Sequence, residues 1–267
     1  DQLRPDRQFR QAGIELIGSG SIAADVEVIA SPCEALMALG VSGLSVDLSL
    51  PALAPALAPA LQVNGPMAAE LREAVNRKDI ASIERLAGAD AGPLVALVQT
   101  AGPADAALAR LDAMKLSTAA EEALKPAREL LPLLAVSLPE LVVTLDPSEH
   151  RGFEYHSGIS FSLFASGVHG EIGRGGRYWA SAPGHAGETA TGTTIYMDML
   201  MQALGEAPQA ERLYLPADVP AELRRARQAD GWMTVVGMDP DADPAEDAHR
   251  LGCSHYWMDG KAVPVRG

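Results

Sequence analysis

Alternation of apolar and polar residues predicts several strands along this chain. Near its middle, Ile159, Phe161 and Leu163 fall on one face of an extended segment, whereas Ser160 and Ser162 fall on the other. This is the pattern of a strand with one buried face. The same argument predicts further strands over residues 9–17, 44–50, 141–145 and 191–195.

Apolar residues at helical spacing predict that much of the remaining chain is helical. The first such segment, residues 25–39, stops at Gly40, and Pro32 should kink it. Residues 51–61 are low in complexity and rich in proline, so an irregular or kinked helix is expected there. Residues 66–134 are helical in pattern throughout, and their apolar stripes are typical of core packing.

Local signals mark where some of these helices begin and end. Asp79 stands where an N-cap is needed, and Thr118 with Glu121 forms a capping-box pair at the start of another helix. A helix over residues 196–204 is expected to end at Gly205.

The end of the chain predicts a small α/β unit that closes with a hairpin turn at Asp259-Gly260. Its expected strands and helices are residues 213–215, 221–229, 232–236, 244–251 and 254–257. The acidic run at 239–243 mimics the start of a calcium loop. Pro244 and Arg250 stand where that loop needs glycine and glutamate, so a calcium site is rejected.

Two polar stretches are candidates for ligand binding. On the first strand, Arg7, Gln11 and Glu15 share one parity, so they could converge on one ligand; a solvent-facing edge would give the same pattern. Arg151 and Tyr155 share the parity of the apolar residues that follow, so both should point inward. A buried arginine needs an anionic partner. Either a carboxylate of this chain or a ligand carboxylate or phosphate could supply it.

Composition narrows the class of protein. The chain has 267 residues, 48% of them hydrophobic, without an apolar run that could cross a membrane and without a secretory leader. A cytoplasmic protein is therefore expected, with Cys33 and Cys253 as reduced core thiols. The net charge of −14 opposes binding to nucleic acid, because no local basic patch is visible.

In combination, the polar stretches resemble the motifs of the histidyl-tRNA synthetase family. Residues 10–18 are similar to its second conserved motif, and residues 151–158 (RGFEYHSG) to its histidine-specific signature. Residues 175–178 (GGRY) match its glycine-rich loop, and residues 190–192 fall where its third motif is expected. The glycine cluster alone, 173–178, is typical of a simple turn. The resemblance implies a histidine pocket formed by Arg7, Gln11, Glu15, Arg151, Tyr155, His156, Arg177 and Tyr178.

The departures from that family concern its nucleotide site. Met199 follows the acidic Asp198 where the family carries an arginine that grips ATP phosphate, and methionine cannot bind a triphosphate. Tyr196 replaces a small residue, and His156 replaces the second tyrosine of the histidine signature. No large anticodon-binding domain follows, and the chain begins too late for the first motif. We therefore expect that an upstream segment is missing.

A retained histidine pocket beside a lost ATP site resembles the regulatory subunit family of ATP phosphoribosyltransferase. The resemblance implies a non-catalytic activator of a short catalytic subunit, which relays feedback inhibition by L-histidine in histidine biosynthesis. It implies a homodimer within a hetero-oligomer, with no cofactor and no metal. A stand-alone histidine-binding paralogue is the alternative, and a histidyl-tRNA synthetase fragment is a further one.

The fold class implied by the resemblance is α+β, a class II synthetase-like, mostly antiparallel sheet flanked by helices. The expected organisation is a core of residues 1–65 and 135–205, a helical insertion over 66–134 and a small α/β domain over 206–267.

Overall fold

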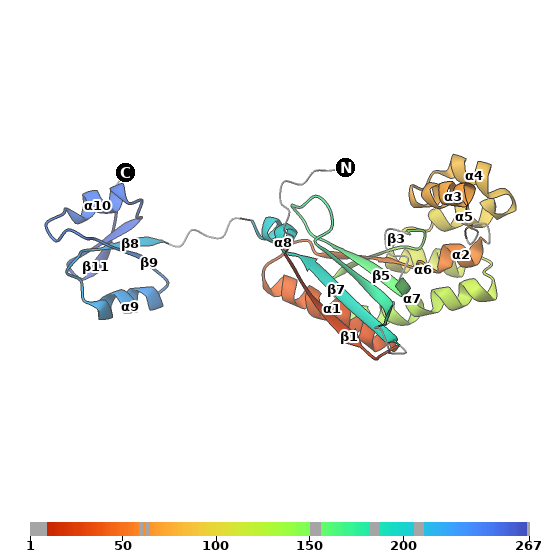
Figure 1. Cartoon of the computed structure of the whole chain (residues 1–267), viewed down its shortest axis with the longest axis horizontal. Helices are drawn as coiled ribbons and strands as arrows, with labels where there is room; N and C mark the ends of the chain where they lie inside the picture. Colours follow the sequence, from red (N-terminus) through yellow and green to blue (C-terminus); the bar gives the residue numbers. More distant parts are fainter. Residues whose placement is uncertain are drawn as a thin grey trace. The chain divides into compact units, whose positions relative to one another are not determined.

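The computed structural model describes residues 10–58, 61, 65–149, 156–181, 187–205 and 211–265. The chain divides into two compact units, Asp1–Gly205 and Glu206–Gly267. Figure 1 shows the elements of each unit, which are described separately below.

A seven-stranded sheet, in the order β1-β7-β6-β5-β2-β4-β3, forms the centre of the larger unit. Strands β2 and β4 are parallel, and every other neighbouring pair is antiparallel. This confirms the predicted mostly antiparallel sheet. The strands are β1 (Gln11–Ile17), β2 (Ser45–Ser49), β3 (Gly102–Pro103), β4 (Val142–Asp146), β5 (His156–Phe164), β6 (Gly173–Ala180) and β7 (Glu188–Tyr196).

Helices cover one face of this sheet. Helix α1 packs on β1, β7 and β6 and lies against α7, which in turn contacts β5 (Figure 1). The described residues between β2 and β4 are mainly helical. The helices of the unit are α1 (Ile22–Ala38), α2 (Leu53–Leu57), α3 (Pro66–Asn76), α4 (Ile80–Ala87), the 3₁₀ turn η2 (Gly88–Asp90), α5 (Ala91–Val98), α6 (Ala104–Asp112), α7 (Thr118–Ser137) and α8 (Met197–Leu204).

The ends of the helices test the predicted caps. The Asp79 carboxylate accepts a hydrogen bond from the backbone N–H of Ser82 at 3.1 Å, so Asp79 is the N-cap of α4. The prediction for α7 was wrong by one residue. Ser117, not Thr118, is the N-cap, and its hydroxyl accepts from the N–H of Ala120. Within the described residues, no helix has the length and apolar character needed to cross a membrane.

The glycine cluster at 173–178 is a strand, so its interpretation as a turn was wrong. It forms most of β6, between β5 and β7. A Cβ atom at Gly175 would lie 2.2 Å from the Gly192 carbonyl oxygen and 2.4 Å from the Phe161 ring. Glycine is therefore required by close packing, on a face where Phe161 belongs to the core.

The smaller unit has a four-stranded mixed sheet, β11-β10-β8-β9, and confirms the small α/β unit expected from the sequence. Buried Tyr214 donates a hydrogen bond to Asp247 at 3.0 Å, which ties the central strand to α10. Asp243 caps α10, so one carboxylate of the rejected calcium loop has a structural role. The elements are β8 (Arg212–Leu215), α9 (Ala221–Ala229), β9 (Met233–Val236), α10 (Pro244–Arg250), β10 (His255–Met258) and β11 (Lys261–Pro264).

Candidate ligand-binding site

The face of the large sheet opposite α1 is polar. The registers of the paired strands place two adjacent rows of residues across six strands of this face. Both rows contain only polar residues and glycine. The first row is Glu15, Gly192, Gly176, Ser160, Ser49 and Asp146. The second is Gly13, Thr194, Arg174, Ser162, Asp47 and Thr144. Polar side chains on such a face can supply the hydrogen bonds that recognise a ligand.

Glu15 on β1 and Tyr178 on β6 contact each other across the strand between them, β7. The Tyr178 hydroxyl on β6 donates a hydrogen bond of 2.8 Å to the Glu15 carboxylate. Gly192 on β7 is paired directly with Glu15, and a Cβ atom there would come within 2.1–2.4 Å of the carboxylate. The absence of a side chain at Gly192 therefore lets the carboxylate lie flat on the sheet, where it can accept hydrogen bonds from a cationic group.

The structure brings three of the predicted site residues to the polar face. Gln11 shares the face of Glu15 because both have the same parity on β1, and Tyr178 is bonded to Glu15. The backbone of His156 pairs with Tyr178, while its side chain lies outside the described part of the structure. Three further predicted residues also lie outside the described residues: Arg7, Arg151 and Tyr155.

Arg177 is not brought together with them. It neighbours Tyr178 on a strand, so its side chain points to the opposite face. There its guanidinium forms an ion pair with Asp25 of α1 at 2.8 Å and donates to the Ser21 carbonyl oxygen at 2.6 Å. Both charged side chains are largely buried, and Asp25 also accepts from the Thr191 hydroxyl at 2.9 Å. Sequence reasoning missed Asp25, because nothing in its local pattern distinguishes it from a solvent-facing residue of a first helical turn.

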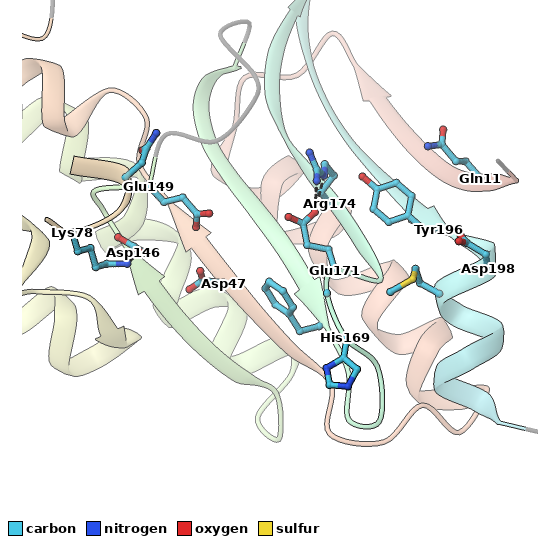
Figure 2. A pocket seen from close by; sticks show the side chains of 14 residues that line it. Gln11, Asp47, Lys78, Asp146, Glu149, His169, Glu171, Arg174, Tyr196 and Asp198 are labelled. Atoms are coloured by element: carbon cyan, nitrogen blue, oxygen red, sulfur yellow. Dashed lines mark hydrogen bonds and ion pairs between the residues drawn. The ribbon is translucent and has the colours of Figure 1, made fainter. Parts of the chain in front are cut away.

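A pocket of about 640 Å³ adjoins this region on the polar face (Figure 2). It begins at Gln11 and Tyr196 and reaches Lys78, which extends from the turn after α3. The lining residues are Gln11, Asp47, Asn76, Lys78, Asp146, Glu149, Phe164, His169, Gly170, Glu171, Arg174, Tyr196, Asp198 and Met199.

The electrostatic character of this pocket is acidic. Its two lysine and arginine side chains are both in ion pairs, Arg174 with Glu171 at 2.6 Å and Lys78 with Asp146 (Figure 2). The Arg174 guanidinium also lies 5.8 Å from the centre of the Tyr196 ring. The pocket carboxylates, which outnumber its cations, are Asp47, Asp146, Glu149, Glu171 and Asp198. Such a lining repels a triphosphate.

The surroundings of Asp47 disfavour its ionised form. Burial raises its pKa above the ordinary aspartate value, and the neighbouring Asp146 adds to the increase. A hydrogen bond donated by Thr144 and the charge of Lys78 oppose the shift. The carboxylate thus lies in surroundings that disfavour further negative charge.

Neither a phosphate-binding arginine nor a metal cluster is found among the described residues of the pocket. Met199, in the position of the expected phosphate-binding arginine, is buried at its wall. Among the described residues, no group of three or more histidine, cysteine, aspartate or glutamate side chains is arranged to hold a metal ion. Cys33 and Cys253 are free and buried, and burial raises the pKa of the Cys33 thiol to about 12. That thiol is inert at neutral pH.

The fold and its polar face correspond to known proteins. The family described as Histidyl-tRNA synthetase matches residues 1–200. An ATP phosphoribosyltransferase regulatory subunit of Paramagnetospirillum magneticum is 48% identical over 95% of this chain and 66% of its own length. The counterpart of Rhodospirillum centenum is 42% identical over 99% of this chain and 68% of its own length. The chain therefore spans about two thirds of the length of these relatives.

Solved structures share the fold. A regulatory subunit/histidyl-tRNA synthetase of Bacillus halodurans C superposes with a TM-score of 0.70 at 24% identity, covering 93% of this chain and 66% of that one. An ATP phosphoribosyl transferase (HisG:HisZ) complex of Thermotoga maritima has a chain with a TM-score of 0.55 at 19% identity, covering 70% and 65%. At these identities, the likeness concerns the fold alone.

The sheet, its polar face and the family match define a class II synthetase-like protein related to histidyl-tRNA synthetases. Within that class, the chain belongs to the family of ATP phosphoribosyltransferase regulatory subunits.

Proposed function

We propose that the protein containing this chain activates a short-form ATP phosphoribosyltransferase catalytic subunit and makes it sensitive to L-histidine. The relatives are regulatory subunits by name, and one structure of the same fold is a HisG:HisZ complex. The catalytic partner carries the reaction, whereas this chain carries the ligand site. Histidine can inhibit only if it binds one state of the assembly more tightly than another.

The Glu15–Tyr178 hydrogen bond over Gly192 is the observation that supports a histidine site most directly. It holds a carboxylate in place on the polar face of the sheet. We assign the ligand ammonium to Glu15, with Gln11 beside it. From the family resemblance, Arg151 takes the ligand carboxylate.

Further contacts in this proposal come from residues outside the described part. Tyr155 closes on the imidazole, and Arg7 and His156 complete the surroundings of the ligand. Arg177 is assigned no contact with histidine, because its guanidinium is paired with Asp25 on the other face.

The adjoining acidic pocket supports the non-catalytic role. Adenylate formation develops negative charge on pyrophosphate and needs fixed cations around it. Here Arg174 and Lys78 are each paired with a carboxylate, and Met199 contributes no charge.

Calorimetric titration with L-histidine and L-histidinol tests the ligand assignment. Histidinol keeps the ammonium and imidazole but lacks the carboxylate. We expect histidine to bind and histidinol to bind more weakly, because the contact with Arg151 is lost. Absence of histidine binding to the full-length protein, alone and with the catalytic subunit, would overturn the assignment.

A further inference from the structure

The buried ion pair behind the site connects the segments that carry it. Tyr178 and Arg177 are consecutive on β6 and point to opposite faces, one toward Glu15 and the other toward Asp25. On the back of the sheet, this ion pair also contacts β7, β5 and the turn that follows β1.

The first attachments involve β1 and β7. The Arg177 guanidinium donates to the carbonyl oxygens of Ser19, at 3.4 Å, and Ser21, at 2.6 Å, in the turn that follows β1. The Asp25 carboxylate accepts a hydrogen bond from the hydroxyl of Thr191, which is adjacent to Gly192 on β7. The same charged pair thus holds the end of the strand bearing Glu15 and the strand that lies beneath its carboxylate.

A third attachment involves β5. Between its pairs with Tyr178 and Gly176, β5 bulges, and Gly158 lies within this irregularity. A Cβ atom at Gly158 would lie 2.9 Å from Cδ and 3.0 Å from Cβ of Arg177, so the arginine stem occupies that space. Gly158 ends the signature that also contains Arg151 and Tyr155.

We propose that Arg177 and Asp25 are positioning residues, which set the histidine site from the back of the sheet without touching the ligand. Their side chains are only 12% and 4% exposed, so solvent screens the pair weakly. Glu15 and Tyr178 stand on strands separated by β7. The network fixes the spacing of all three strands, and the 2.8 Å bond on the front depends on that spacing. The expected change in histidine affinity rests on the proposed histidine-binding function. The hydrogen bond between Glu15 and Tyr178 can be tested without a ligand.

The test compares Asp25→Asn with Thr193→Val in the full-length protein. Asp25→Asn removes the negative charge of the pair and keeps the shape of the side chain. Thr193 is a matched control, because its buried hydroxyl also joins β7 to α1. It donates to the Val28 carbonyl oxygen at 2.6 Å, within α1, rather than to the ion pair. Arg177→Lys is a second variant for use if Asp25→Asn does not fold.

Two measurements are made on each folded variant: the affinity for L-histidine by calorimetry, and the ¹³Cζ resonance of Tyr178, assigned with Tyr178→Phe. Asp25→Asn should weaken histidine binding at least tenfold and move the Tyr178 resonance, while Thr193→Val changes neither. Combined with Tyr178→Phe, Asp25→Asn should cost less affinity than it does alone, because both act on one contact.

Equal effects of Asp25→Asn and Thr193→Val would overturn the proposal, since they would indicate general loosening of β7 on α1. An unmoved Tyr178 resonance in Asp25→Asn would overturn it as well. If the wild-type protein binds no histidine but the resonance moves only in Asp25→Asn, the positioning role stands and the proposed histidine function fails.

Discussion

Tyr178 donates a hydrogen bond of 2.8 Å to Glu15 although their strands are not neighbours in the sheet. The bond passes over Gly192 of β7, whose missing side chain provides the space. A glycine, an acid and a tyrosine from three strands of the sheet thus lie together on its polar face.

Removal of the Glu15 carboxylate should weaken histidine binding. Hydrogen bonds to charged groups contribute about 1.5–3 kcal/mol, so Glu15→Ala should lower the affinity about tenfold or more. Calorimetry on the variant checks the value. Glu84→Ala, on the exposed side of α4, is the control and should bind like the wild type. Unchanged affinity in Glu15→Ala would remove Glu15 from the site.

Substitution of Gly192 should separate ligand binding from stability. In Gly192→Ala, the three atoms nearest the new methyl group all belong to the movable carboxylate of Glu15. We therefore expect a loss of histidine affinity with little change in the thermal midpoint. In Gly13→Ala, the methyl group would lie 2.2 Å from the backbone carbonyl oxygen of Thr193, so this variant should lose stability. Calorimetry and thermal unfolding distinguish the two. A Gly192→Ala variant with full affinity would show that the position of Glu15 does not matter.

Asp47 should make the folded state less stable as the pH rises. Its pKa is raised on folding, so the folded state binds more protons than the unfolded chain at pH values above about 4. The contribution of Asp47 to the free energy of unfolding therefore decreases as the pH rises from about 4 through the raised pKa. Asp47→Asn removes the ionised group, and its amide oxygen can still accept from Thr144.

Thermal unfolding between pH 4 and pH 7 measures this effect. The variant should gain most over the wild type near pH 7 and least near pH 4, whereas Glu84→Gln should show no such trend. A gain that is largest at low pH would contradict the direction of the shift.

The protein should not form histidyl-adenylate. Histidine-dependent exchange of labelled pyrophosphate into ATP should remain at background, because the pocket carries excess negative charge and Met199 supplies no cation. An active histidyl-tRNA synthetase serves as the positive control. Exchange above background would contradict the non-catalytic assignment.

Much of the sheet could be predicted from the sequence because its strands alternate apolar and polar residues. The core positions Phe161 and Leu163 and the polar positions Ser160 and Ser162 fall on opposite faces, as the pattern indicates. Strand β6 could not be predicted in this way. Its glycines carry no periodic signal, since they reflect close contact with neighbouring strands.

The family resemblance implied that Arg177 and Tyr178 belong to the same pocket. On a strand, consecutive residues point to opposite faces, which places Arg177 beside Asp25. Its partner is contributed by a helix far away in the sequence, so only the three-dimensional arrangement reveals the pair.

The central claim is tested most directly by the rate of a short-form ATP phosphoribosyltransferase catalytic subunit measured alone, with the full-length protein, and with that protein plus L-histidine. We predict a higher rate on addition of the protein and a fall when histidine is added. Coupling between sites is typically about 1–3 kcal/mol, so histidine should change substrate affinity by roughly 5- to 150-fold. Arg151→Ala should preserve activation and abolish inhibition by histidine. Equal rates under all three conditions would contradict the regulatory function and favour a stand-alone histidine-binding protein.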